Sequence, residues 1–357
     1  MTPQERLKLT LAHKQPDRPP IMVQWVPEVK AALDQELERR GITVDIAQLF
    51  ELDFRGVGPR RVQTPAAPTP SPDQGSAYGI YQDVTGKPLA WIQSLDDVRG
   101  FQPQNDPDAF DYSTINAVCR SCAPFIRMTG SPGMFDIVNR MGARGRGYEN
   151  LICEIMEEDP VTVAMIDKQL EYDYEWLRRT LEAGAGQIDV VHLGEDCGNQ
   201  HCSLFDPAFF RRWFGPRLKR FIDLAHRHGA ALMLHSCGSN RVLLPIFIDL
   251  GLDIFDVCQP EPEGMDPEGL KRDFGRHITF CGMLSLQQTF PHGTPDECRR
   301  QVEHRCRVIG KDGGYIFSSG NTFTKDIPVA NILAAFEGAT GKSLIGDAMT
   351  RSRGSIL

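Results

Sequence analysis

The sequence predicts a single (β/α)8 barrel with a short helical extension before it and a loop excursion near the barrel mouth. Three observations lead to this prediction. The chain has 357 residues, which suits one large α/β domain. Short apolar runs, often rich in β-branched residues, alternate along it with longer helical patterns. There are eight such runs, and neither GxGxxG after the first run nor GxxxxGK[ST] anywhere supports the alternative, an open doubly wound sheet.

The first twenty residues predict the helical extension. Thr2 and Glu5 have the spacing of a capping box, and Leu7, Leu9 and Leu11 follow before a turn that contains Pro16. We expect the barrel to cover residues 21–345 and a C-terminal tail to cover 346–357.

Eight segments have the apolar pattern of buried parallel strands. They cover residues 21–26, 52–57, 125–128, 188–193, 230–234, 252–257, 278–280 and 315–317. Helical patterns separate them, and most begin at Pro or Asp and end near Gly. The clearest cover residues 29–40, 161–183, 207–228, 241–250, 295–309 and 329–336.

A proline-rich segment interrupts the alternation. Residues 63–74 contain four prolines and no periodic pattern, and residues 78–92 then resemble a hairpin that turns at Thr85 and Gly86. We interpret both segments as an excursion over the barrel mouth, with a linker between two domains as the alternative.

The composition narrows the class of function. Charged residues make up 24% of the chain, mean hydropathy is -0.30, and no run of about 18 apolar residues could span a bilayer. The net charge of -8 disfavours a nucleic-acid-binding face, so small molecules are the expected ligands. The first residues lack the pattern of a secretory signal, which predicts a cytoplasmic protein whose ten cysteines are free thiols.

Potential metal ligands follow several predicted strands, where barrel active sites lie. His235 and Cys237 follow the run 230–234, and residues two apart on an extended chain point to the same side. Cys281 follows the run 278–280, on an alternate strand whose inward side chains would share a layer with that pair. One histidine, two cysteines and one open position form a catalytic zinc arrangement. Glu195 could fill the open position.

Two alternatives stand beside this metal site. An HxC pair is a short motif, and buried cysteines often serve packing alone. Glu195 and Asp196 could also act as acid and base without a metal, although neighbouring residues on a regular strand point to opposite sides. The position of the HxC pair at a strand end favours the metal site.

Several segments resemble the uroporphyrinogen decarboxylase superfamily over nearly the whole chain. They are TPQERLKLTLAHKQPDRPPI, GYENLICEIMEEDP, GEDCGNQ, DPAFFRRWFGPRLKRFID, LHSCGS, QPEPEGMDPEGLKRDFG and GGYIFSSGNTFTKDIPVANILAAFEG. The resemblance implies a (β/α)8 barrel. It also implies one of two activities, because the superfamily contains tetrapyrrole decarboxylases and corrinoid-linked methyltransferases.

The decarboxylase branch is marked by arginines and a catalytic aspartate in an RQAGR-type segment after the first strand. This chain has MVQWVPEVK there, with Gln24, Trp25 and Glu28 at the places of the cations. Such a rim would repel a polyanion, so tetrapyrrole decarboxylation is the alternative interpretation.

The methyltransferase branch is marked by an HxC pair at the end of the fifth strand, which His235 and Cys237 match and which implies zinc binding. Its methanogen members take a third ligand from a cysteine in the loop after the last strand. This chain has Ser319, Gly320 and Asn321 there. We therefore expect Cys281 to be the third ligand on geometric grounds, with Glu195 as the competing candidate.

The resulting hypothesis is a zinc-dependent methyltransferase that moves a methyl group between a small methylated donor and the cobalt of a corrinoid protein. The expected substrate-binding residues are Trp25, Tyr81, Asn321 and Phe323. The rings of the three aromatic residues among them favour a methoxyaromatic donor. Packing roles for these side chains are the alternative. A barrel that binds a metal or ligand without turnover is the second alternative function, and the resemblance is compatible with a homodimer.

Overall fold

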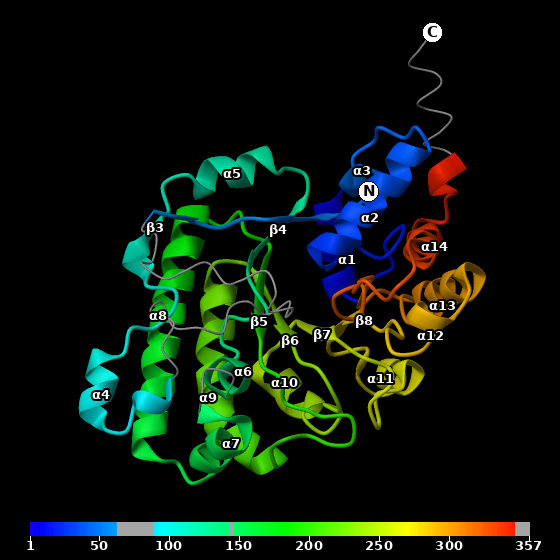
Figure 1. The fold of residues 1–357 in the computed structure, drawn as a ribbon. Helices are drawn as coiled ribbons and strands as arrows, with labels where there is room; N and C mark the ends of the chain where they lie inside the picture. Colours follow the sequence, from blue (N-terminus) through cyan, green and yellow to red (C-terminus); the bar gives the residue numbers. More distant parts are fainter. Residues whose placement is uncertain (63–88, 143–145, 347–357) are drawn as a thin grey trace.

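Seven parallel strands form one curled sheet in the computed structural model of the protein, which describes residues 1–62, 89–142 and 146–346 (Figure 1). Their order is β1-β4-β5-β6-β7-β8-β9. They are β1 Phe54–Gly56, β4 Ile126–Gly130, β5 Val190–Gly194, β6 Ala231–His235, β7 Ile254–Val257, β8 Thr279–Gly282 and β9 Tyr315–Ile316. The predicted α/β class and seven of the eight predicted strands are confirmed.

The segment 21–26 is not the regular strand that the sequence predicts. It forms only isolated parallel bridges, between Ile21 and Phe317 and between Trp25 and Phe323. The N–H of Asp53 also donates to the carbonyl of Ile21 at 2.9 Å, so the segment lies between the two edge strands β9 and β1. Prolines at both ends of the segment lack N–H donors and limit a longer ladder. The eightfold regularity of the predicted barrel is therefore not confirmed.

Helices lie around the outside of the sheet (Figure 1). They are α1 Pro3–Leu11, α2 Pro27–Arg39, α3 Ile46–Leu49, α4 Leu95–Gly100, α5 Ile115–Ser121, α6 Ile137–Met141, α7 Tyr148–Met156, α8 Pro160–Gly184, α9 Pro207–Arg227, α10 Leu244–Leu250, α11 Pro267–Phe274, α12 Thr289–His292, α13 Pro295–Val308 and α14 Val329–Thr340. A short antiparallel pair, β2 Arg60–Arg61 and β3 Phe110–Asp111, lies outside the main sheet. The long helices expected from the pattern are confirmed within a few residues.

Local sequence explains where several helices begin. Thr2 and Glu5 form the predicted capping box at the start of α1. Asp159 and Asp206 cap α8 and α9 by accepting hydrogen bonds from backbone N–H groups of the first turn, and a proline follows each aspartate. These caps fix the points at which the chain leaves a loop and returns along the sheet.

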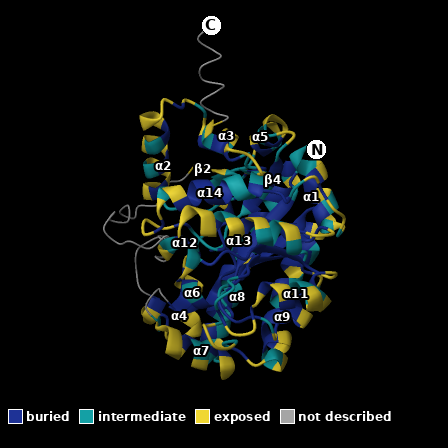
Figure 2. Cartoon of the chain, turned by 90° about the vertical axis from the view of Figure 1, so that its right-hand side faces the viewer, coloured by how far each residue is buried: buried dark blue, intermediate teal, exposed yellow. Residues whose placement is uncertain are grey.

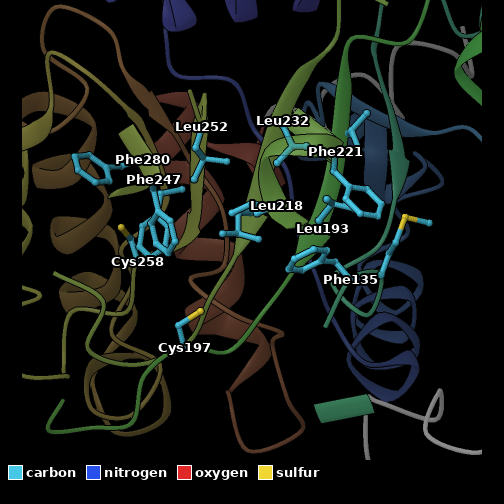
Figure 3. Packing of buried hydrophobic residues seen from close by; sticks show 14 of the residues in the cluster. Phe135, Leu193, Cys197, Leu218, Phe221, Leu232, Phe247, Leu252, Cys258 and Phe280 are labelled. Atoms are coloured by element: carbon cyan, nitrogen blue, oxygen red, sulfur yellow. The ribbon is translucent and has the colours of Figure 1, made fainter. Parts of the chain in front are cut away.

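The strands separate two apolar layers, as their alternating side chains require. The interior cluster lies inside the curled sheet and consists of Leu7, Met22, Phe54, Ile126, Val190, Ala231, Met233, Ile254, Cys281 and Ile316. The outer layer packs strand residues such as Leu193 and Leu232 against helix residues such as Leu218 and Phe221 (Figure 3). Figure 2 shows the buried strands at the centre and exposed residues on the outer faces of the helices.

The predicted proline-rich loop at 63–74 lies outside the described residues, as does most of the predicted hairpin at 78–92. Its last residues form a short 3-10 helix, η1 Leu89–Trp91, instead of a strand. Residues 347–357 of the expected tail also lie outside the description. No helix in the described ranges is both long and apolar enough to cross a membrane.

Candidate functional site

The carboxyl ends of β5, β6, β7 and β8 place side chains of different strands at one level. Gly194 pairs in register with His235, His235 with Asp256, and Asp256 with Cys281. Paired residues on adjacent strands point to the same face of a sheet. The register therefore places polar side chains of three strands, β6, β7 and β8, at one level. We call this end of the sheet the carboxyl rim and define it as residues 194–197, 235–238, 256–258 and 318–322.

His235, Cys237 and Asp196 form a compact group at the carboxyl rim. The Nε2 atom of the buried His235 lies 3.5 Å from the Sγ atom of the half-buried Cys237. The backbone N–H of Cys237 donates to Asp196 Oδ1 at 2.8 Å. One ligand atom from each of the three residues lies within 4.8 Å of the others. Imidazole, thiolate and carboxylate are all zinc ligands, so these residues could hold a metal ion.

Asp256 orients His235 from the other side of its ring. Its Oδ2 atom lies 2.8 Å from His235 Nδ1 and 3.3 Å from His192 Nε2, while its Oδ1 atom has no hydrogen-bond partner among the described residues. Burial alone would raise the pKa of Asp256, but the two histidines hold it below its ordinary value. Sequence reasoning missed Asp256 and His192. The signal was a charged or polar residue inside each of two apolar strand runs.

The pKa values of His235 and Cys237 are also shifted. Burial alone would lower the pKa of His235, but Asp256 and Cys237 raise it well above its ordinary value. Burial raises the pKa of Cys237, although His235 opposes this. A bound metal ion would have to displace protons from His235 and Cys237, as is usual for histidine and cysteine ligands.

Asn321 lies at the same group. Its Nδ2 atom donates to the Cys237 sulfur at 3.3 Å. An amide donor so placed stabilises negative charge on the sulfur. The sequence predicted Asn321 as a substrate-binding residue. It did not predict this hydrogen bond to Cys237.

Glu195 lies apart from this group. The buried carboxylate accepts hydrogen bonds from the backbone N–H groups of Ile137, at 2.8 Å, and Val138, at 3.1 Å, which begin helix α6. Burial, together with the charge of Asp136, raises its pKa well above the ordinary value. Glu195 belongs to neither group of potential metal ligands among the described residues.

Asp136 and Asn139 extend the carboxylate cluster. The Nδ2 atom of Asn139 donates both to Asp136 Oδ1, at 3.0 Å, and to Asp196 Oδ2, at 2.9 Å. Burial and the nearby charge of Asp196 raise the pKa of Asp136 to about 7. Neither residue was predicted, because helix α6 reaches the carboxyl rim from a separate part of the chain. Asn139 holds the Asp196 carboxylate in place.

Cys281 lies in the interior cluster. Its fully buried sulfur is 3.7 Å from Met22 Sδ, and burial raises its pKa well above the ordinary value. It belongs to neither potential ligand group in the described part of the chain. The structure therefore brings His235 and Cys237 together but does not bring Cys281 to them.

A cavity of about 520 Å³ lies beside the carboxyl rim. Its lining comes from the segment 22–27, from β1 and a residue before it, from β4 and the two residues after it, and from single residues of β5 and the last loop. The lining residues are Met22, Val23, Gln24, Trp25, Val26, Pro27, Leu52, Phe54, Gly56, Met128, Gly130, Ser131, Pro132, His192 and Thr322. This volume lies in the range of small-molecule sites.

The predicted substrate-binding aromatic residues have different positions. Trp25 lines the cavity and meets Phe50 edge-on, with ring centroids 6.2 Å apart. Phe323 is fully buried in the outer layer, where its ring centroid is 5.7 Å from that of Phe290. Tyr81 lies outside the described residues. Of the two aromatic side chains that lie in the described residues, Trp25 lines the cavity and Phe323 does not.

The fold and the carboxyl rim define an α/β protein with a curled parallel sheet and a potential metal site at the carboxyl ends of its strands. Comparison with known proteins then gives the family. The family model described as uroporphyrinogen decarboxylase (URO-D) matches residues 83–340. The chain belongs to the uroporphyrinogen decarboxylase family, which confirms the resemblance seen in the sequence.

Individual relatives are distant. A uroporphyrinogen decarboxylase of Pseudoalteromonas translucida (strain TAC 125) is 23% identical over 259 residues, which cover 67% of this chain and 66% of that protein. A methyltransferase from Methanosarcina mazei has a similar fold, with a TM-score of 0.61, 15% identity, and coverage of 96% of this chain and 99% of that chain. The first of these proteins is named a decarboxylase and the second a methyltransferase.

Proposed function

We propose that this protein is a zinc-dependent methyltransferase that moves a methyl group between a small methylated donor, such as a methoxyaromatic compound, and the cobalt of a corrinoid carried by a partner protein. The group of Asp196, His235 and Cys237 at the carboxyl rim carries the proposal. Family membership and a fold shared with a methyltransferase support it.

The three side chains fit a zinc ion. With Zn–N near 2.1 Å, Zn–S near 2.3 Å and a tetrahedral angle, the nitrogen and sulfur ligands would be about 3.6 Å apart. His235 Nε2 and Cys237 Sγ are 3.5 Å apart. We assign the third position to Asp196, because its carboxylate lies with the pair whereas Glu195 faces α6 and Cys281 faces Met22. Three protein ligands leave one position open, as in catalytic zinc sites.

Zinc held there would supply Lewis acidity that stabilises the heteroatom leaving the methyl group. The chain's own residues prepare that site. Asp256 accepts from His235 Nδ1, which leaves Nε2 as the ligand atom and fixes the ring. Asn321 donates to the Cys237 sulfur and stabilises its negative charge. The neighbouring cavity would hold the donor.

Decarboxylation of a tetrapyrrole is the second candidate, because a curated relative has that activity. The described lining of the cavity weighs against it. Within residues 1–62, 89–142 and 146–346 it contains no lysine or arginine to bind the carboxylates of such a substrate.

Metal content tests the proposal directly. Protein purified without chelator should contain about one zinc per chain. His235→Ala and Cys237→Ala should each lose it. Cys202→Ser, at an exposed cysteine outside the group, should keep it and serves as the control.

Activity completes the test. Parent protein with 2-methoxyphenol and cob(I)alamin should form methylcobalamin, followed by its absorbance, and the two zinc-site variants should not. Zinc-free parent protein that decarboxylates uroporphyrinogen would overturn the proposal in favour of the second candidate.

A further inference from the structure

Asn240 is a fully buried polar residue in the loop that carries Cys237. The two N–H groups of its Nδ2 atom are shared among three successive backbone carbonyls, those of Ser236 at 3.3 Å, Cys237 at 2.8 Å and Gly238 at 3.0 Å. Its Oδ1 atom accepts from the hydroxyl of Ser236 at 3.1 Å. A buried carbonyl that loses its partner is costly. One side chain thus holds the turn that follows β6.

The backbone of Cys237 is fixed on both sides. Its carbonyl accepts from Asn240, and its N–H donates to Asp196 Oδ1 at 2.8 Å. With both peptide groups held, the place of the sulfur depends on one side-chain torsion, χ1. The Sγ atom lies 3.5 Å from His235 Nε2, close to the separation of two zinc ligands. These hydrogen bonds are therefore enough to present the thiol at that distance.

Ser236 extends the same hydrogen bonding to the loop that carries Asp196. Its buried hydroxyl donates to Asn240 Oδ1 and accepts from the backbone N–H of Cys197 at 3.0 Å. A chain of hydrogen bonds thus leads from Asn240 to the residue next to Asp196. Buried chains of this kind are rigid when each member is satisfied. The loops after β5 and β6 are therefore held relative to each other.

We propose that Asn240 is a positioning residue. It holds Cys237 directly, and through Ser236 it holds the loop of Asp196, so that the ligand atoms of both residues lie ready for a metal ion beside His235. The inference deepens the proposed function and rests on it for the identity of the metal. Removing a residue that holds a metal ligand usually weakens metal binding by about 10- to 100-fold.

Asn331 provides a matched control. It is also buried, and its Nδ2 atom donates to two backbone carbonyls, those of Phe290 at 2.8 Å and Gly293 at 2.9 Å. This asparagine holds the turn around α12 instead of the turn at Cys237. Asn240→Ala and Asn331→Ala therefore remove the same kind of interaction from two different loops. A difference between the two variants reports on the loop that carries Cys237 and not on lost stability alone.

Zinc affinity, measured by competition with a chelator, tests the consequence for the metal. Asn240→Ala should lower the affinity by about 10- to 100-fold, and Asn331→Ala should keep the affinity of the parent. Ser236→Ala, which cuts the link between Asn240 and Cys197, should lower it by about three- to tenfold.

Cobalt(II) in place of zinc adds a spectroscopic signature. The thiolate-to-cobalt absorption band should shift or weaken in Asn240→Ala and stay unchanged in Asn331→Ala, because a residue that only stabilises the fold does not alter the bond to Cys237. Parent zinc affinity and an unchanged band in Asn240→Ala would overturn the proposal.

Hydrogen exchange, measured by mass spectrometry, tests the inference in metal-free protein. The backbone N–H groups of residues 236–239 all donate hydrogen bonds, which should protect them. Segment 236–239 should exchange at least about tenfold faster in Asn240→Ala and at the parent rate in Asn331→Ala. Parent exchange in Asn240→Ala would overturn the proposal. If that variant does not fold, Ser236→Ala carries both tests, and parent zinc affinity with parent exchange in it would overturn the proposal.

The two measurements also separate this inference from the proposed function. Faster exchange in Asn240→Ala, together with a parent protein that binds no zinc, would support the positioning of Cys237 and remove the proposed function. Zinc in the parent, together with parent affinity and parent exchange in Asn240→Ala, would do the reverse.

Discussion

At the amino end of the curled sheet the buried carboxylate of Asp53 faces two arginines, whereas at the carboxyl rim the buried carboxylate of Asp256 faces two histidines. Asp53 Oδ1 lies 2.7 Å from Arg6 Nη1, and Asp53 Oδ2 lies 2.6 Å from Arg18 Nη1. The backbone N–H of Ile21 also donates to Asp53, at 2.7 Å. This aspartate uses both oxygens, and its charge is compensated permanently because arginine does not lose its proton.

The carboxyl rim is organised differently. Glu195, Asp196 and Asp256 form no ion pair with a lysine or arginine within the described ranges, and their partners are histidines, an amide and backbone N–H groups. Asp256 Oδ1 is buried without a hydrogen-bond partner there. The amino end thus satisfies its charges by itself. The carboxyl rim leaves ligand atoms that a cation or a bound molecule could satisfy.

The largest effect is expected at the amino end. Asp53→Ala removes the buried carboxylate that Arg6 and Arg18 share and leaves them only the more exposed Asp17 and Glu51. This change should lower the free energy of unfolding by about 3–5 kcal/mol. Urea denaturation measures this. Zinc content per folded chain should not change, because Asp53 lies at the opposite end from His235. Asp34→Ala, which removes an exposed pair with Lys30, should cost less than about 1 kcal/mol. A loss for Asp53→Ala as small as that of the control would contradict a stabilising role for the amino-end network.

Asp256→Asn probes the carboxyl rim. The amide cannot hold the His235 ring with the same charge, so zinc affinity should fall about 10- to 100-fold, measured by competition with a chelator. Asp253 provides a matched control on the same stretch of chain, because it contacts His226 Nε2 at 2.7 Å just before β7, away from the rim. Asp253→Asn should keep the affinity of the parent. Equal zinc affinities in the parent, Asp256→Asn and Asp253→Asn would show that Asp256 does not support metal binding.

The two ends should also respond to pH with opposite sign in metal-free protein. Hydrogen bonds from Arg6 lower the pKa of Asp17 at the amino end, so its contribution to stability is present above its ordinary pKa near 3.8 and is lost as the pH falls further. Burial raises the pKa of Asp136 to about 7, so the folded state binds more protons than the unfolded state between about pH 4 and pH 7. Stability should therefore decline as the pH rises through that window.

Urea denaturation with a chelator at several values between pH 4 and pH 8 checks this sign. Asp136→Asn should flatten the decline by about 1 kcal/mol or more. A profile that rises through the window in the parent, or the same decline in the variant, would exclude Asp136 as its source.

Sequence patterns predicted the elements that depend on local order. Apolar runs located seven strands, and the capping pattern at Thr2 located the first helix. The spacing of His235 and Cys237 predicted that both would reach one point, and their ligand atoms lie 3.5 Å apart. Segment 21–26 departed from the pattern for two reasons. Prolines flank it, and its bridges to Phe317 and Phe323 form only when the sheet closes on itself.

The rest of the site depends on relations between distant segments. Asp256 reaches His235 only because β6 and β7 pair in that register, and no spacing in the sequence encodes it. Glu195 turns to α6 because the backbone N–H groups at the start of that helix lie within reach. The neighbouring residue Asp196 then faces Cys237. Strand alternation had predicted that one of these two carboxylates would face the pocket, but it could not choose between them.

Cys281→Ala should have the smallest effect on the carboxyl rim. The sulfur packs against Met22 within the interior cluster, so its removal should lower the free energy of unfolding by about 1 kcal/mol through a small cavity, while zinc content and affinity stay at the parent values. Asp196→Ala should instead weaken zinc binding, because it removes the carboxylate that lies with His235 and Cys237. Metal analysis of the two variants side by side decides the third ligand. Zinc lost from Cys281→Ala but kept in Asp196→Ala would restore the ligand set predicted from the sequence, and the sheet would then have to bring β8 closer to β6 when the metal binds.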